Sequence, residues 1–368
     1  MMERRRIVRL WRLGGASVLV TLVRAAGSSY RRAGARLLLG DKGEYAGTIS
    51  GGCLEAEVVR KAAWMVREGA VVQRYSTLFD DTEEVPFGLG CGGVVDLLVE
   101  PVETAECSAL IEAMEGSLAG KAATVVTWLP GEGKGLRRVV LRDGEIVFAS
   151  EGLGEKKLAC AGGLRAGVEY EGRFVEELLP PQRLFVLGAG DDARPLVSMA
   201  ALLGWSVVVA DGRGQLARAE RFPEAERVVA LEGGETAGLG IRAEDAVVVM
   251  THSYEQDREI LASLLPVAPR YLGLLGARHR SSLLISEAAA MIGKSVAECC
   301  ERVLAPVGLD LGGDGPEAIA LAVMAEVQAV CMGKLGATRR LSAEDVARYV
   351  KEGGASRYLQ VQCALGEG

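Results

Sequence analysis

The sequence is poor in the residues that build zinc sites. It has only two histidines in 368 residues, and its eight cysteines include no C-x-x-C pair. Structural zinc needs four such ligands at short spacings, so the composition disfavours a zinc site. Cysteines scattered in this way are typical of reduced thiols, and we therefore expect a cytoplasmic protein.

The chain also lacks a hydrophobic run long enough to cross a membrane. A basic stretch precedes the short apolar run 16–23, but arginines interrupt it and strand-like sequence follows, which favours a basic helix and a core strand over an export signal. The net charge of −7 argues against general nucleic-acid binding. We expect a protein that binds neither membranes nor nucleic acid.

Length and pattern predict two α/β domains with separate cores. Pro180-Pro181 marks the expected boundary between them. The predicted parts are an N-terminal domain at 1–179, with a core at 15–103 and a β-rich extension at 105–178, a C-terminal domain at 182–335, and a peripheral tail at 336–368. The extension itself contains no residue pattern that suggests chemistry.

The stretch 183–213 has the most specific pattern in the chain. An apolar run meets the turn Gly188-Ala189-Gly190, a helix-like segment follows, and a second apolar run ends at Asp211. This is a β-α-β unit with the G-x-G-x-x-[GA] fingerprint, and it predicts a Rossmann-like, doubly wound parallel sheet. Gly188 would allow the tight turn, Gly190 would let a ligand approach the backbone, and Asp211 stands where a ribose hydroxyl is bound.

Two carboxylates weaken the prediction of a dinucleotide. Asp191 and Asp192 directly follow the turn, where a pyrophosphate needs N–H groups. Carboxylates at a helix start are commonly caps, and there they would repel a diphosphate. The fold is therefore predicted firmly, whereas NAD(P) is disfavoured as its ligand.

Two glycine-flanked cysteines are candidate ligand-binding thiols. A short strand is predicted from Thr48 to Ser50, followed by the turn Gly51-Gly52 and a helix from about Cys53. A helix start exposes a thiol and lowers its pKa, although Glu55 and Glu57 act in the opposite direction; a small buried packing residue is the alternative. Cys91 lies between glycines in a second loop, and the sequence does not show whether it adjoins Cys53.

Basic residues and a histidine complete the candidates. Arg31, Arg32 and Arg36 flank a glycine-serine turn, and they are either an anion site or a solvated loop. His252 follows a predicted strand of the Rossmann-like sheet and could transfer protons or be structural. Arg278 follows another strand and could bind a phosphate in the crevice or belong to a helix-start charge cluster.

These blocks together resemble the XdhC/CoxI family, the accessory factors of xanthine dehydrogenase and related molybdenum hydroxylases. The resemblance runs from about residue 15 to 330, and 105–178 adds little to it. The blocks that carry it are GSSYRRAGARLLL, GTISGGCLEAEV, GLGCGGVVDLLVEPV, FVLGAGDDARPLV, VVVADGR, THSYEQD, YLGLLGARHR and PVGLDLGGDGPEAIALAVMAEV. The chain departs from the family's common pattern at Tyr30 and Ala33, where proline is frequent.

The resemblance implies an XdhC domain, a Rossmann-like domain, and a factor that holds and protects the sulfurated molybdenum cofactor and passes it to an apo-enzyme. It further implies a homodimer whose partners are an apo molybdenum hydroxylase and a cysteine desulfurase. Cys53 and Cys91 would then coordinate molybdenum or relay sulfur, since soft ligands suit such centres. An NAD(P)-dependent oxidoreductase and a cysteine-based sulfur carrier remain as alternatives.

Overall fold

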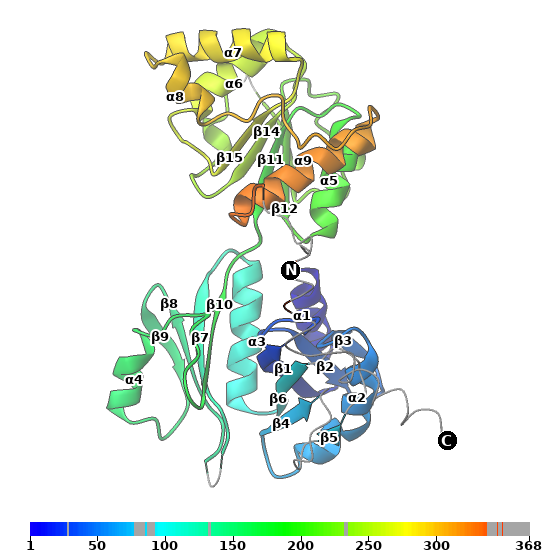
Figure 1. Cartoon of the computed structure of the whole chain (residues 1–368), viewed down its shortest axis with the longest axis vertical. Helices are drawn as coiled ribbons and strands as arrows, with labels where there is room; N and C mark the ends of the chain where they lie inside the picture. The colour runs from blue at the N-terminus through cyan, green and yellow to red at the C-terminus, as the bar shows by residue number, and fades with distance from the viewer. Residues whose placement is uncertain are drawn as a thin grey trace. The chain divides into compact units, whose positions relative to one another are not determined.

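The chain folds into two compact units: among the described residues, the first contains those up to Pro180 together with 344 and 348, and the second contains those from Pro181 to 336 (Figure 1). The computed structural model describes residues 1–27, 29–76, 85–86, 93–131, 134–231, 235–336, 344 and 348, without the side chains of 53, 76, 85 and 86. Each unit has hydrophobic clusters drawn from its own residues alone.

Two sheets form the framework of the first unit. The longer strands carry continuous buried runs that pack on both faces of the sheet, and β1 lies between β2 and β6, antiparallel to both. In the order β3-β2-β1-β6-β4-β5, the larger sheet contains β3 (Tyr45–Gly47), β2 (Arg36–Gly40), β1 (Ala16–Gly27), β6 (Gly93–Pro101), β4 (Val71–Ser76) and β5 (Val85–Pro86). The smaller, antiparallel sheet contains β10 (Arg173–Leu178), β7 (Ala123–Trp128), β8 (Arg137–Arg142) and β9 (Glu145–Ala149).

Helices cover the faces of these sheets. Residues of α1 and α3 share one hydrophobic cluster with residues of both sheets, whereas α2 packs on the other face of the larger sheet and α4 on that of the smaller. A buried ion pair between Arg138 on β8 and Glu100 on β6 also joins the two sheets at 2.9 Å. The helices are α1 (Met2–Leu13), α2 (Cys53–Met65), α3 (Ala105–Leu118) and α4 (Glu155–Ala161).

The short strand lies three residues earlier than the sequence pattern predicts. It is β3 (Tyr45–Gly47), whereas Thr48 to Ser50 form a turn. The prediction was wrong because Gly47 adopts φ +92°, which ends the pairing, and because the backbone N–H groups that follow bond to a side chain of α2.

The second unit is the predicted parallel, doubly wound sheet. All four pairings are parallel, and the order β13-β12-β11-β14-β15 places the first strand of the fingerprint at the centre. Four of its five strands are almost wholly buried, as expected of a sheet covered on both faces. Its strands are β11 (Arg183–Leu187), β12 (Ser206–Asp211), β13 (Arg227–Ala230), β14 (Ala246–Val249) and β15 (Tyr271–Leu274).

Two helical layers enclose this sheet. Residues of α5 and α9 pack in one cluster, and residues of α6, α7 and α8 pack in the other (Figure 1). Pro316 occupies the first turn of α9, where its missing N–H costs nothing. The helices are α5 (Ala193–Leu202), η1 (Ala219–Arg221), η2 (Ala237–Leu239), α6 (Tyr254–Leu264), α7 (Arg278–Met291), α8 (Val296–Cys300) and α9 (Pro316–Cys331). None of the helices in the described residues is long and apolar enough to span a membrane.

Candidate ligand-binding sites

The turn Gly51-Gly52 leads directly into α2, which begins at Cys53 as predicted. Gly52 has φ +113°, a backbone conformation that side chains with a Cβ rarely adopt. The thiol of Cys53 and the whole of Cys91 lie outside the described residues. Their exposure, their ionisation and their proximity therefore stay predictions.

Glu55 organises the turn in front of Cys53. Its carboxylate accepts hydrogen bonds from the N–H groups of Ile49, Ser50 and Gly52 at 2.8 to 3.1 Å, and from the hydroxyls of Thr48 and Ser50. Burial favours the neutral acid, but the hydrogen bonds from Ser50 and Thr48 outweigh it and hold the pKa of Glu55 at about 2. Three N–H groups of this turn that could bind an anion are thus already bound to a carboxylate.

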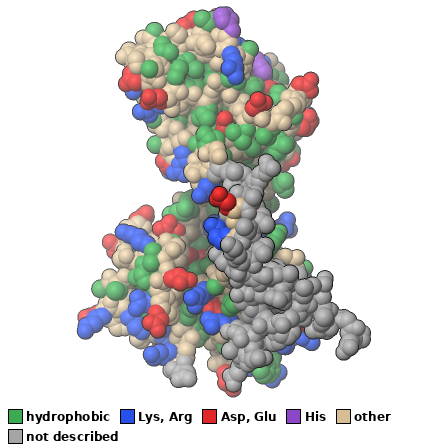
Figure 2. Space-filling model, viewed as in Figure 1, with side chains coloured by type: hydrophobic (Ala, Val, Ile, Leu, Met, Phe, Trp, Pro, Cys, Tyr) green, Lys and Arg blue, Asp and Glu red, His purple; other side chains and the backbone are tan. Residues whose placement is uncertain are grey.

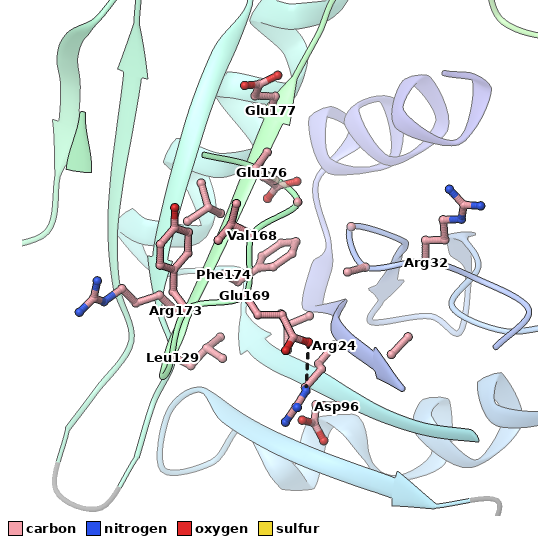
Figure 3. Close-up of a pocket in the computed structure, with 18 of the residues that line it drawn as sticks. Arg24, Arg32, Asp96, Leu129, Val168, Glu169, Arg173, Phe174, Glu176 and Glu177 are labelled. Atoms are coloured by element: carbon pink, nitrogen blue, oxygen red, sulfur yellow. Dashed lines mark ion pairs between the residues drawn. The ribbon is translucent and has the colours of Figure 1, made fainter. Parts of the chain in front are cut away.

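A cavity of about 1130 Å³ lies in the first unit, between residues 23–36 on one side and 166–178 on the other. We call it the N-terminal cleft (Figure 3). Arg31, Arg32 and Arg36, the predicted basic patch, all line it. Three further arginines and five carboxylates also line it: Arg4, Arg24, Arg173, Asp96, Glu169, Glu171, Glu176 and Glu177.

Two ion pairs cross the N-terminal cleft. Arg36 donates to Glu176, and both side chains are almost buried. At the other end, Nε of Arg24 lies 3.5 Å from Oε1 of Glu169, and this pair is largely exposed (Figure 3). Because exposed pairs contribute little, we expect the buried pair to hold the two walls together and the exposed pair to separate readily.

Three guanidinium groups of the cleft, those of Arg4, Arg32 and Arg173, form no ion pair with a described carboxylate. Arg4 donates to the hydroxyl of Ser117 at 2.7 Å and to the carbonyl of Leu179 at 2.8 Å, both of them neutral oxygens. Burial, together with the nearby charge of Arg36, lowers the pKa of Arg4 to about 10. Arg32 is exposed and forms no ion pair with any described residue. Positive charge is therefore incompletely neutralised at this end.

The wall formed by 166–178 is a feature that the sequence pattern did not reveal. Its loop is bounded by Gly167 and Gly172, and β10 follows it. Phe174 and Leu129 pack with Val23 and Leu98 in a small apolar cluster where the two sheets approach each other. The available signal was a glycine-bounded loop with alternating acidic and aromatic residues. This pattern indicates a cleft wall only once the fold is known to place it opposite the arginines.

The fingerprint glycines of the second unit have different surroundings. Gly188 has φ +132°, and a Cβ there would lie 2.2 Å from the carbonyl oxygen of Met250, so the tight turn requires glycine. A Cβ on Gly190 would instead lie 2.4 Å from the carboxylate of Asp192. The place where a ligand would approach this backbone holds a side chain of the protein itself.

Neither carboxylate after the turn caps α5, contrary to the structural interpretation offered by the sequence. Asp192 occupies the N-cap position without a capping bond, and its Oδ2 lies 2.8 Å from Nε2 of His252. Asp191 is exposed and pairs with Arg221 at 2.8 Å. The basic side chains that face the turn draw both carboxylates away from the helix N–H groups.

Asp211 is fully buried at the end of β12. Its two oxygens accept from the N–H of Ala189 at 2.7 Å and from the backbone and guanidinium of Arg213 at 2.8 to 2.9 Å. Burial alone would raise the pKa of Asp211, but these hydrogen bonds lower it. Four donors fill the lone pairs of a carboxylate, so none is left for a ribose hydroxyl in this arrangement.

The other two crevice candidates, His252 and Arg278, have different surroundings. His252 has φ +64° and joins α5 to the end of β14 through its bond to Asp192. Arg278 is exposed at the first residue of α7, and Arg280, rather than Arg278, binds a buried carboxylate, that of Asp257, at 2.7 Å. Among the described residues, no group of three or more His, Cys, Asp or Glu could hold a metal ion.

Comparison with known proteins places the two units in one family. Residues 10–76 match the model of the XdhC and CoxI family, and residues 184–327 match that of the XdhC Rossmann domain. A Bacillus subtilis relative, named as a probable xanthine dehydrogenase subunit, is 30% identical over 84% of this chain and 92% of its own. The chain belongs to the XdhC and CoxI family.

Two further XdhC-like proteins match nearly the whole chain. The molybdenum cofactor insertion chaperone PaoD of Escherichia coli is 25% identical over 86% of this chain and 84% of its own. A crystal structure described as a xanthine dehydrogenase from Bacillus halodurans has a TM-score of 0.76, is 26% identical, and covers 94% of this chain and 99% of its own. The XdhC assignment therefore extends across both units.

Proposed function

We propose that this protein binds the molybdenum cofactor, protects its sulfurated form and delivers it to an apo molybdenum hydroxylase of the xanthine dehydrogenase type. The observation that carries the proposal is the similarity, over most of both chains, to a relative named a molybdenum cofactor insertion chaperone. The relative from Bacillus subtilis, whose name places it with a xanthine dehydrogenase, supports the class of client. The protein would act by binding and transfer rather than by turnover.

The residues of the first unit suit such a group. The cofactor carries a pterin and a phosphate, so it needs cations and a wall for a flat ring. Among the described residues, the N-terminal cleft has three arginines without a carboxylate partner, and the buried Nε of Arg36 has no hydrogen-bond partner. When bound, the cofactor supplies the molybdenum and its sulfur; the protein supplies charge neutralisation and exclusion of water.

The remaining parts of the proposal concern partners and thiols. We propose a cytoplasmic homodimer that receives sulfur from a cysteine desulfurase, with Cys53 and Cys91 as ligands of molybdenum or sulfur carriers. Light scattering should give a mass near twice 38.8 kDa for the dimer. Cofactor retained in a Cys53→Ala, Cys91→Ala double variant would exclude both thiols from binding.

Extraction of bound cofactor tests the function. Protein purified from a host that makes molybdopterin should yield the fluorescence of oxidised pterin after denaturation and oxidation. Incubation of the same protein with an apo molybdenum hydroxylase should raise the activity of that enzyme and remove the pterin from the factor. Absence of pterin in a competent host would refute the proposal.

A nicotinamide-dependent oxidoreductase is the second candidate, favoured by the parallel sheet and the G-x-G turn. Asp191 at the turn and the fully bonded carboxylate of Asp211 oppose it. Saturable NADH binding with substrate-dependent oxidation would establish this candidate, and its absence would remove it.

A further inference from the structure

The N-terminal cleft is chemically graded along its length. Figure 3 shows Glu176 and Glu177 at one end, Phe174 and Val168 between, and Arg24 with Glu169 and Asp96 at the other end, while Arg32 stands apart on the opposite wall. The cavity thus has an end where Arg4 and Arg36 lie beside Glu176 (the cationic end), an apolar middle, and an end where Glu169 lies beside Arg24 (the acidic end).

The cationic end is prepared for an anion. Arg36 is almost buried, its Nε has no hydrogen-bond partner in the described structure, and its only carboxylate partner there is Glu176. Burial and then the nearby charge of Arg36 lower the pKa of Arg4, the charge of Glu176 partly offsets them, and within the described chain Arg4 is hydrogen-bonded only to neutral oxygens. Arg32 adds a third guanidinium at the exposed rim. A phosphate here would relieve the repulsion among these cations and accept from the free N–H groups.

The acidic end suits a different chemical group. Glu169 is 80% exposed and meets Arg24 only at 3.5 Å, and Glu171 is exposed without an ion pair in the described structure. A 2-amino-4-oxopyrimidine edge presents adjacent N–H donors, which a carboxylate binds through both oxygens. Such carboxylates would weaken the binding of a simple anion. They favour a ligand that carries a phosphate at one end, for the arginines, and N–H donors at the other end, for the carboxylates. Basic and acidic side chains also share the visible surface of the first unit (Figure 2).

We propose that the N-terminal cleft, rather than the Rossmann crevice, holds a phosphorylated pterin, with the phosphate at Arg4, Arg32 and Arg36 and the aminopyrimidinone edge at Glu169. This rests on the proposed function and names its site. The ring lies between the ends, against Phe174 and Val168, where stacking on an aromatic side chain and removal of apolar area from water stabilise it. The crevice of the second unit cannot offer the same chemistry, because its turn presents Asp191 and Asp192.

Substitutions on the two walls separate the two ends of the ligand. Arg32→Ser removes a cation that has no ion-pair partner among the described residues, so the described fold loses no ion pair. Glu169→Gln removes an exposed pair. Arg165→Ser is the matched control, since Arg165 is exposed on the same segment but does not line the cleft. Fluorescence anisotropy of the full-length protein with neopterin monophosphate and with neopterin measures binding directly.

We expect Arg32→Ser to weaken binding of neopterin monophosphate by roughly three- to tenfold and to leave neopterin unchanged. Glu169→Gln should weaken both ligands by about tenfold, because Gln accepts with one oxygen and places a donor opposite the second N–H. Arg165→Ser should bind both ligands as the wild type does. Unchanged binding in both wall variants would overturn the assignment.

Extraction of pterin from the same variants distinguishes failure of the site from failure of the function. Pterin in the wild type and in both wall variants alike would overturn the cleft and leave the function standing. No pterin in the wild type would refute the function, and the anisotropy titration would still decide whether the cleft binds the ring. Guanosine monophosphate has the same edge, and its binding in preference to neopterin monophosphate would assign the cleft to a guanine nucleotide instead.

Discussion

Glu55 shows how one buried carboxylate can define a loop. Five hydrogen bonds from residues 48–52 converge on it, and they fix the turn that precedes Cys53. Its position at the third residue of α2 was visible in the sequence, but its partners were not. The acceptor capacity of a glutamate does not specify which donors the fold will bring to it.

Substitution of Glu55 should destabilise the first unit in a pH-dependent way. We expect Glu55→Gln to lower the free energy of unfolding by about 1–3 kcal/mol at pH 7, since charge-assisted bonds to backbone N–H groups are lost. The pKa of Glu55 falls from 4.5 to about 2 on folding, so the unfolded chain binds more protons between these values. The wild-type advantage is complete above about pH 5 and is lost as the pH falls toward 2.

Urea unfolding of both proteins between pH 7 and pH 3.5 measures this difference. Glu68→Gln is the control, because Glu68 is exposed shortly after α2 and forms no ion pair with a described residue. A difference between wild type and Glu55→Gln that stays constant with pH would contradict the assigned pKa.

Arg213 is the residue on which the buried charge of Asp211 depends. Arg213→Ala leaves the carboxylate with two backbone donors, and we expect a loss of about 2 kcal/mol in the stability of the second unit. Hydrogen exchange of the backbone amides of β11 and β12 measures this loss of stability. Arg218→Ala, an exposed position in the same loop, is the control, and equal exchange in both variants would show that solvent compensates Asp211.

At the scale of elements, most helices and strands follow from the sequence. The β-α-β unit, the start of α2 and the start of α9 were predicted because glycine, proline and apolar periodicity are local signals. The strand predicted from Thr48 to Ser50 was wrong because a side chain of α2 competes for its N–H groups. A local sequence pattern does not show that a side chain from another element will bind the N–H groups that a strand would need.

The two fingerprint glycines should respond differently to alanine. Gly188→Ala places a Cβ against the backbone of Met250 in a positive-φ conformation, and we expect a loss of at least about 3 kcal/mol. Gly190→Ala meets mainly the side chain of Asp192, which can move, so we expect a loss below about 1.5 kcal/mol. Thermal and urea unfolding compare the stability of the two variants. A larger loss in Gly190→Ala than in Gly188→Ala would contradict the backbone contacts assigned to this turn.

At the scale of the whole molecule, the units should unfold independently. Their hydrophobic clusters, as far as the chain is described, share no residue. We expect the losses from Glu55→Gln and Gly188→Ala to add within about 0.5 kcal/mol in the double variant. Segment-resolved hydrogen exchange should place the first loss in the unit before Pro180 and the second after it. A coupling energy well above that margin would mean that the two folds support one another.

The N-terminal cleft could not be predicted from the sequence because its two walls are far apart along the chain. The basic patch was found, but its partner Glu176 stands 140 residues after Arg36, in a segment without a recognised motif. Charge in one segment predicts an anion site only when its neighbours are known. Here a second sheet brings those neighbours, and the order of strands within it cannot be read from local periodicity.

The two walls of the cleft have different relations to the rest of the family. Residues 23–36 lie within the matched range 10–76, whereas 166–178 fall outside both matched ranges. Sequence changes in 166–178 can therefore alter the chemistry of one wall while the arginines of 23–36 are retained. If the cleft holds the ligand proposed above, exchange of residues 166–178 alone should change the ligand preference, and a chimaera that carries another relative's segment at these positions tests this.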